Sequence, residues 1–133
     1  MADNFETIRA SVQGFFNTGW STRTPIQWEQ VPFEPTPGTA YVTIWVSDND
    51  IRQVGLGSVR PFRVFGIVQI DINCPVNTGI ATITGHADKV KDIFLGKQTT
   101  AGVTFTNMKV FKTVVGVWQR WCVSFNFYKD ILV

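Results

Sequence analysis

The feature that most constrains the fold is a long alternation of side chains from Phe62 to Asn73. One face of this segment is aliphatic apart from one glycine, and it consists of Val64, Gly66, Val68, Ile70 and Ile72. Strict alternation of this kind predicts a β-strand with one face in the core. The opposite face ends in Gln69, Asp71 and Asn73, which we expect to face water, a channel or a neighbouring subunit.

The remaining segments predict a small sheet with two helices. Strand patterns occur at 24–28, 41–46, 102–112 and 116–128, and prolines make the first of these an edge strand. Apolar residues at spacings of three and four predict helices over 4–17 and about 77–95, and Thr18-Gly19 is expected to end the first. The order of elements predicts a single α+β domain spanning 1–133. Its expected architecture is a mixed or antiparallel sheet of four to five strands with two helices packed on one face.

A long connection, 48–61, is expected to form a loop arm. Turn-forming residues at 47–50 end the preceding strand, and connections of this length are usually functional or disordered. The segment from Arg52 through Arg63 holds three arginines and no acid. It also carries the apolar residues Val54 and Leu56, which could pack against a partner. We expect the arm to contact a neighbouring subunit or another protein. The residues assigned to that contact are Arg52, Val54, Leu56, Arg60 and Arg63.

Composition and charge exclude several classes of protein. The chain is 44% hydrophobic and only 17% charged, which excludes an intrinsically disordered protein. A net charge of +2 is too small to indicate a nucleic-acid binder from bulk charge. Residues 1–50 hold two basic and six acidic side chains, so the rest of the chain is basic. This asymmetry suits head-to-tail contacts between subunits, and scattered solvated charge is the alternative.

No group of residues in the sequence has the pattern of a catalytic or metal site. The single histidine, His86, has no ligand-type side chain at metal-binding spacing, and it is interpreted as structural. Cys74 and Cys122 form no CxxC motif and are expected to be buried free thiols. Gly55-Leu56-Gly57 lacks the remaining residues of a phosphate-binding loop. We therefore expect no enzyme activity, no cofactor, no secretory leader and no membrane span.

Several short strings, in their order and spacing, are similar to one protein family. They are Phe5-Glu6-Thr7-Ile8-Arg9, the stretch from Thr24 to Phe33 that contains Pro25-Ile26-Gln27-Trp28 and Val31-Pro32-Phe33, Thr39-Ala40-Tyr41-Val42, and Gly66 to Ile72. A helix that ends in Ala87-Asp88-Lys89-Val90 and Phe94 follows them. Together they resemble the tail terminator proteins of long-tailed bacteriophages, the lambda-like group of minor tail proteins. Gln30 stands where the usual pattern has Asn.

The resemblance implies a structural role in the virion. Members of that family form a ring, expected here to be a homohexamer, that caps the finished tail tube and stops its polymerisation. The implied partners are further copies of the chain, the major tail tube protein and the head–tail connector or stopper protein, with DNA passing through the channel. The implied location is the head–tail junction of the virion, after assembly in the host cytoplasm. The alternatives are another neck ring protein, such as a connector or stopper, or a small nucleic-acid-binding module.

Overall fold

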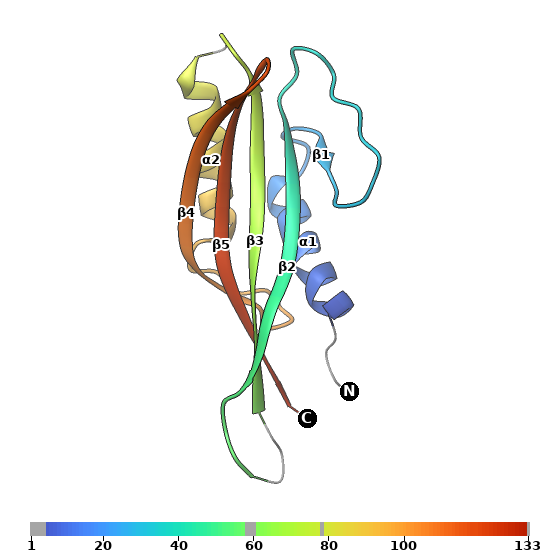
Figure 1. The fold of residues 1–133 in the computed structure, drawn as a ribbon, viewed down its shortest axis with the longest axis vertical. Coiled ribbons are helices and arrows are strands. Elements are labelled where there is room, and N and C mark those ends of the chain that lie inside the picture. The colour runs from blue at the N-terminus through green and yellow to red at the C-terminus, as the bar shows by residue number, and fades with distance from the viewer. Residues whose placement is uncertain (1–4, 58–60, 78, 133) are drawn as a thin grey trace.

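The computed structural model describes residues 5–57, 61–77 and 79–132, which form one sheet and two helices (Figure 1). The elements in chain order are α1 (Phe5–Trp20), β1 (Ile26–Gln27), β2 (Tyr41–Gln53), β3 (Pro61–Pro75), α2 (Ile80–Phe94), β4 (Thr104–Val115) and β5 (Trp118–Leu132). The strand order in the sheet is β1-β2-β3-β5-β4. The short strand β1 runs parallel to β2 and all other pairs are antiparallel, so the predicted α+β fold with a mixed sheet is confirmed.

Both helices cover the same face of the sheet, and the core lies between them and the strands (Figure 1). The predicted inward face of β3 is buried, as is the inward face of β5. The buried residues of β5 are Trp121, Val123, Phe125 and Phe127. Helix α2 buries Ile83, Ala87, Val90, Ile93 and Phe94. The opposite face of the sheet carries neither helix, and we call it the open face.

The first helix extends one turn beyond its predicted end. Thr18 and Gly19 were expected to stop it, but α1 continues to Trp20, whose ring is buried and stacks on Phe16 at 5.5 Å between centroids. Gly19 lies where the two helices approach each other, because a Cβ atom there would lie 2.8 Å from Cγ1 of Ile93. The glycine therefore allows close packing of α1 on α2 and does not end the helix.

The predicted loop arm at 48–61 is wrong for most of its length. Strand β2 continues through Ser47–Asp50 to Gln53, and it pairs with the first residues of β3 in the register Ile51↔Val64 to Gln53↔Phe62. A β-bulge between Asp48 and Asp50 interrupts the register where the turn was expected. Pairing with β3 gives the backbone N–H and C=O groups of these residues hydrogen-bond partners. The stabilisation from this pairing outweighs their local preference for a turn. Strand β3 likewise continues past Asn73, where the predicted alternation ends, and includes Cys74 and Pro75.

The result is a hairpin arm in place of a loop arm. We use this name for 50–53 of β2, 61–65 of β3 and 54–57, the described part of the connection between them. The arm projects beyond the helices at the lower end of the molecule in Figure 1. The end of β5 also pairs with it, in the register Arg63↔Asp130 and Phe65↔Tyr128. A projecting arm of paired strands has a defined direction, which a flexible loop lacks.

Candidate functional site: the open face and the hairpin arm

The centre of the open face is polar and is organised around Asp71. Gln69 and Asp71 both lie on it, as their position in the alternation predicts. The Asp71 carboxylate accepts hydrogen bonds from Gln69 Nε2 at 2.8 Å and from the indole Nε1 of Trp45 at 3.3 Å. Ser124 and Cys122 on β5 are the cross-strand partners of Gln69 and Asp71. Asp71 thus holds two neighbouring side chains in fixed positions on this face.

The cysteine on this face is not activated. Cys74 and Cys122 are free thiols, as predicted, but only Cys74 is fully buried. Burial, together with the adjacent Asp71 carboxylate, raises the pKa of Cys122 to about 11. The thiol is therefore protonated at neutral pH, and a protonated thiol is a poor nucleophile and a poor metal ligand.

Large apolar side chains lie at the two edges of the open face. Trp45 on β2 is 42% exposed and Phe111 on β4 is 67% exposed. One row of cross-strand partners on this face runs from Trp45 on β2 through Gln69 to Ser124. The neighbouring row on the same face ends at the opposite edge of the sheet, at Phe111 on β4. Neither residue was singled out from the sequence. Exposed aromatic side chains beside a weakly charged surface are typical of protein interfaces.

The two described arginines of the arm each have an acidic partner. Arg52 donates to Asp50 Oδ2 at 2.6 Å, and its guanidinium lies over the Phe65 ring. Arg63 donates to both carboxylate oxygens of Asp130, at 2.7 and 3.1 Å. The hydrogen bonds from Arg63 lower the pKa of the Asp130 carboxyl. The expected cluster of arginines without acids is therefore a set of ion pairs, because an acid 67 residues away in sequence reaches Arg63.

The apolar residues assigned to the arm are exposed at its end. Val54 donates its backbone N–H to the Pro61 carbonyl oxygen at 2.9 Å, which closes the hairpin. Its side chain is half exposed, and Leu56 is 93% exposed. Arg60, which was assigned to the same contact, lies outside the described residues. Leu56 is thus the most exposed large apolar side chain of the described residues.

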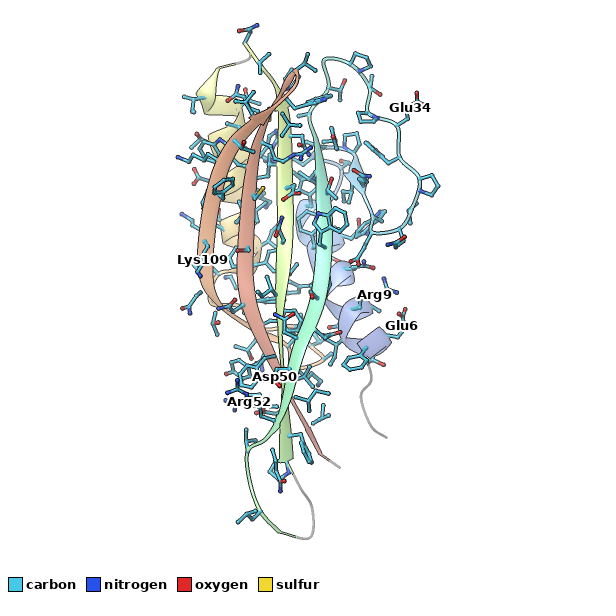
Figure 2. All side chains as sticks on the ribbon, viewed as in Figure 1. Glu6, Arg9, Glu34, Asp50, Arg52 and Lys109 are labelled. Carbon is cyan, nitrogen blue, oxygen red and sulfur yellow. The ribbon has the colours of Figure 1, made fainter. Side chains whose placement is uncertain are left out.

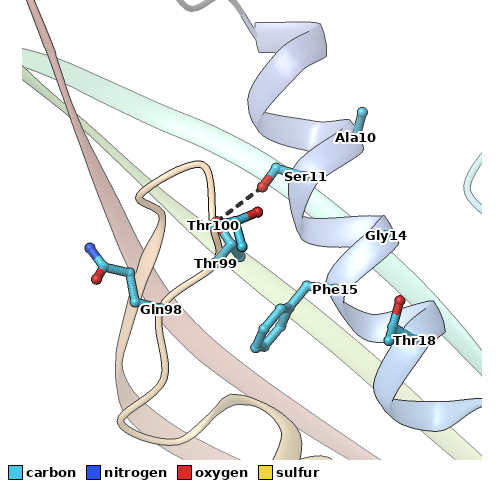
Figure 3. Close-up of a pocket in the computed structure, with 8 residues that line it drawn as sticks. All are labelled: Ala10, Ser11, Gly14, Phe15, Thr18, Gln98, Thr99 and Thr100. Atoms are coloured by element: carbon cyan, nitrogen blue, oxygen red, sulfur yellow. Dashed lines mark hydrogen bonds between the residues drawn. The ribbon is translucent and has the colours of Figure 1, made fainter.

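A shallow groove of about 450 Å³ lies between α1 and the segment 98–100 (Figure 3). The Ser11 hydroxyl donates to the Thr99 hydroxyl across it at 3.0 Å. The residues that line it are Ala10, Ser11, Gly14, Phe15, Thr18, Gln98, Thr99 and Thr100. None of these lining residues is an acid, a base or a thiol, so the groove has no pair of groups for acid–base chemistry.

A metal site and a membrane span have no support in the described part of the chain. Within 5–57, 61–77 and 79–132, no group of three or more His, Cys, Asp or Glu side chains is arranged to hold a metal ion. Over the same residues, neither helix has the length and apolar character needed to cross a membrane.

His86 joins the two helices. Its Nδ1 accepts a hydrogen bond from Arg23 Nε at 2.9 Å, and its ring lies 5.6 Å from that of Trp20. Burial and, to a smaller extent, the positive charge of Arg23 lower the pKa of His86 below its ordinary value of about 6.5. This agrees with the structural role that the sequence indicated.

We expect the fold to lose stability below about pH 6.5 through His86. Below that pH, the unfolded chain binds a proton at His86 more readily than the folded chain does. The stabilising contribution of His86 is therefore fully present above its pKa in the unfolded chain, and it decreases as the pH falls toward its lower pKa in the folded chain. The measurement is the urea midpoint at pH 7.5 and 5.5 for the wild type and for His86→Gln. The wild type should lose more stability than the variant, and equal losses would contradict the prediction.

Comparisons with known proteins place this fold in a family. No curated protein matches the sequence. One solved structure superposes with a TM-score of 0.69 at 18% identity, over 96% of this chain and 95% of its own. A chain in a structure of the virion of a native gene transfer agent particle superposes with a TM-score of 0.60 at 17% identity, over 95% of both chains. The family model for phage tail terminator protein matches residues 7–120, so this chain belongs to the phage tail terminator family.

Proposed function

We propose that this chain forms a ring that caps the phage tail tube and stops its polymerisation. The ring also provides a docking surface for the head-side connector, and it is part of the virion at the head–tail junction. The observation that carries the proposal is the family match over 7–120. The shared fold with a chain of a gene transfer agent virion supports it. A ring protein of this kind acts through its surfaces and needs no catalytic group.

Three surfaces of the described chain support this proposal. The polar centre of the open face, with Gln69 and Asp71, is suited to line the channel, because the Asp71 carboxylate repels the phosphates of passing DNA. Contact of these two residues with a neighbouring subunit is the alternative. The exposed aromatic side chains at the edges of the open face are suited to contacts between subunits. The hairpin arm, with Leu56 at its end, is suited to reach the tube protein.

The experiment measures oligomeric state and tube growth together. Light scattering gives the mass of the purified chain alone and after addition of short tubes of the major tail tube protein. We expect a ring, a homohexamer, to form on the tube ends and further growth of the tubes to stop. A chain that ignores tubes and binds a head-side connector or portal would instead indicate a connector or stopper. Binding to DNA that weakens steeply with salt would indicate a nucleic-acid-binding module.

We predict that the arm arginines contribute to capping. The triple variant Arg52→Ala, Arg60→Ala, Arg63→Ala should keep the fold, since exposed ion pairs contribute little to stability. The concentration needed to stop tube growth should rise about tenfold, which corresponds to one lost charged contact. Replacement of Lys89, Lys91 and Lys97 by alanine removes the same charge outside the arm and is the control. Normal capping by the arm variant would show that these arginines do not contact the tube.

A further inference from the structure

Charge is divided between the two lateral edges of the sheet. The stretch 24–51 holds four acidic residues and no basic one, and it forms the β1–β2 side. The stretch 93–129 holds five basic residues and no acidic one, and it forms β4, β5 and their connections. Figure 2 shows Glu34 on one side of the molecule and Lys109 on the other. The strand order therefore places the acidic stretch 24–51 and the basic stretch 93–129 on opposite sides of the sheet.

Each edge also exposes apolar side chains beside its charges. We define the basic edge as Lys109, Phe111, Lys112 and Val114 of β4. Lys109 and Phe111 lie on the open face, whereas Lys112 and Val114 lie on the helix face, where Lys112 Nζ is 4.2 Å from the centroid of the Trp121 ring. Phe111 and Val114 are among the most exposed apolar residues of the described chain. We define the acidic edge as Glu29, Val31, Glu34 and Trp45, of which Val31 and Trp45 are exposed apolar residues. An exposed aromatic side chain flanked by charges is the composition expected at the centre and rim of an interface.

The edge of β2 is already covered on the acidic side of the sheet. The outward backbone N–H of Val42 donates to the Pro25 carbonyl oxygen at 3.1 Å. The backbone N–H of Val46 donates to the Glu29 carboxylate, also at 3.1 Å. These two donors of β2 are therefore not available to a strand of another subunit. Side chains on this edge can still make charge-complementary and apolar contacts.

We propose that the basic edge of one copy of this chain docks on the acidic edge of the next copy. Lys109 then faces Glu34, and Phe111, on the same face of β4 as Lys109, packs against the apolar residues Val31 and Trp45. Each copy uses two different surfaces, so the contact is head-to-tail and, once the rotation closes, produces a ring. This inference rests on the proposed function and specifies which surfaces build the ring. It leaves the polar centre of the open face uncovered between the two contacts.

The test reverses the charge of each edge and then combines the variants. The basic-edge variant is Lys109→Glu, and the acidic-edge variant is Glu34→Lys. Light scattering on tube ends should show that each variant alone needs at least about tenfold more protein to assemble than the wild type. An equimolar mixture should recover assembly, because every contact in an alternating ring then pairs opposite charges. Lys91→Glu on α2 changes the same charge away from both edges, and this control should assemble normally.

A second variant tests the apolar part of the same contact. Phe111→Ser leaves all charges in place and should raise the assembly concentration about thirtyfold, as loss of a central aromatic contact does. Circular dichroism confirms that each variant is folded.

The outcomes separate this inference from the proposed function. Wild-type assembly by all edge variants, or a mixture that fails to recover, would overturn the edge-to-edge contact while capping by the wild type still stands. A wild type that neither assembles nor caps tubes would overturn the proposed function and the inference with it.

Discussion

Replacing Phe94 with alanine is expected to lower the free energy of unfolding by about 3–5 kcal/mol. The Phe94 ring is fully buried at the end of α2, where the two helices meet the sheet. Its centroid lies 5.9 Å from that of Phe16 on α1, 4.8 Å from Phe105 on β4 and 5.2 Å from Phe125 on β5. The substitution therefore leaves a cavity that three separate elements would have to shift to fill.

The measurement is urea unfolding followed by tryptophan fluorescence and circular dichroism. Phe5→Ala is the matched control, because the Phe5 side chain is 58% exposed at the start of α1 and leaves no cavity. The control should change the free energy of unfolding by less than about 0.5 kcal/mol. A loss below about 1 kcal/mol for Phe94→Ala would mean that the two helices do not share one core with the sheet.

The residues of the core could be predicted from the sequence because burial repeats with the period of each element. The alternation in 62–73 identifies the buried face of β3, and the spacing in 77–95 identifies the buried face of α2. Phe5 and Ile80 are exceptions, since each has the right spacing but lies in the first turn of its helix, beyond the edge of the core. Periodicity gives the direction of a side chain and does not show where the core ends.

The hairpin arm could not be predicted because its strands are stabilised by each other. Ser47–Asp50 have the local preferences of a turn, and nothing near them in sequence opposes it. The opposing contribution comes from β3, more than ten residues later, and from β5, whose end pairs with the arm. Segments that form only through such distant pairing are the ones that local patterns describe poorly.

The candidate site was predicted in part, for the same reason. The polar face of Gln69 and Asp71 follows from alternation alone, and the structure places both residues on the open face. The acidic partner of Arg63 is Asp130, which only the register between β3 and β5 brings close. Trp45 and Phe111 become recognisable as edge residues only once the strand order is known. The charge asymmetry of the chain can be read from the sequence, but the position of the charges at opposite edges requires the strand order.

Replacing Gly66 with alanine is expected to destabilise the fold by about 1–3 kcal/mol, as overpacking of a core does. Gly66 is buried on β3, opposite Asp48 at the bulge from which the hairpin arm extends. A Cβ atom there would lie 2.5 Å from the Ser47 carbonyl oxygen and would also meet the Phe127 ring. The carbonyl belongs to the β2 backbone, so it cannot move without shifting the arm relative to the sheet.

The same substitution at Gly14 should have the opposite sign. Gly14 lies within α1, and a Cβ atom there has no heavy atom within 4 Å. Alanine is the better helix former, so Gly14→Ala should stabilise the fold by about 0.5–1 kcal/mol. Urea unfolding checks both signs. At a temperature where both variants are folded, tube capping should weaken for Gly66→Ala alone, because only that change displaces the arm. Equal stability and equal capping of the two variants would show that the bulge does not fix the position of the arm.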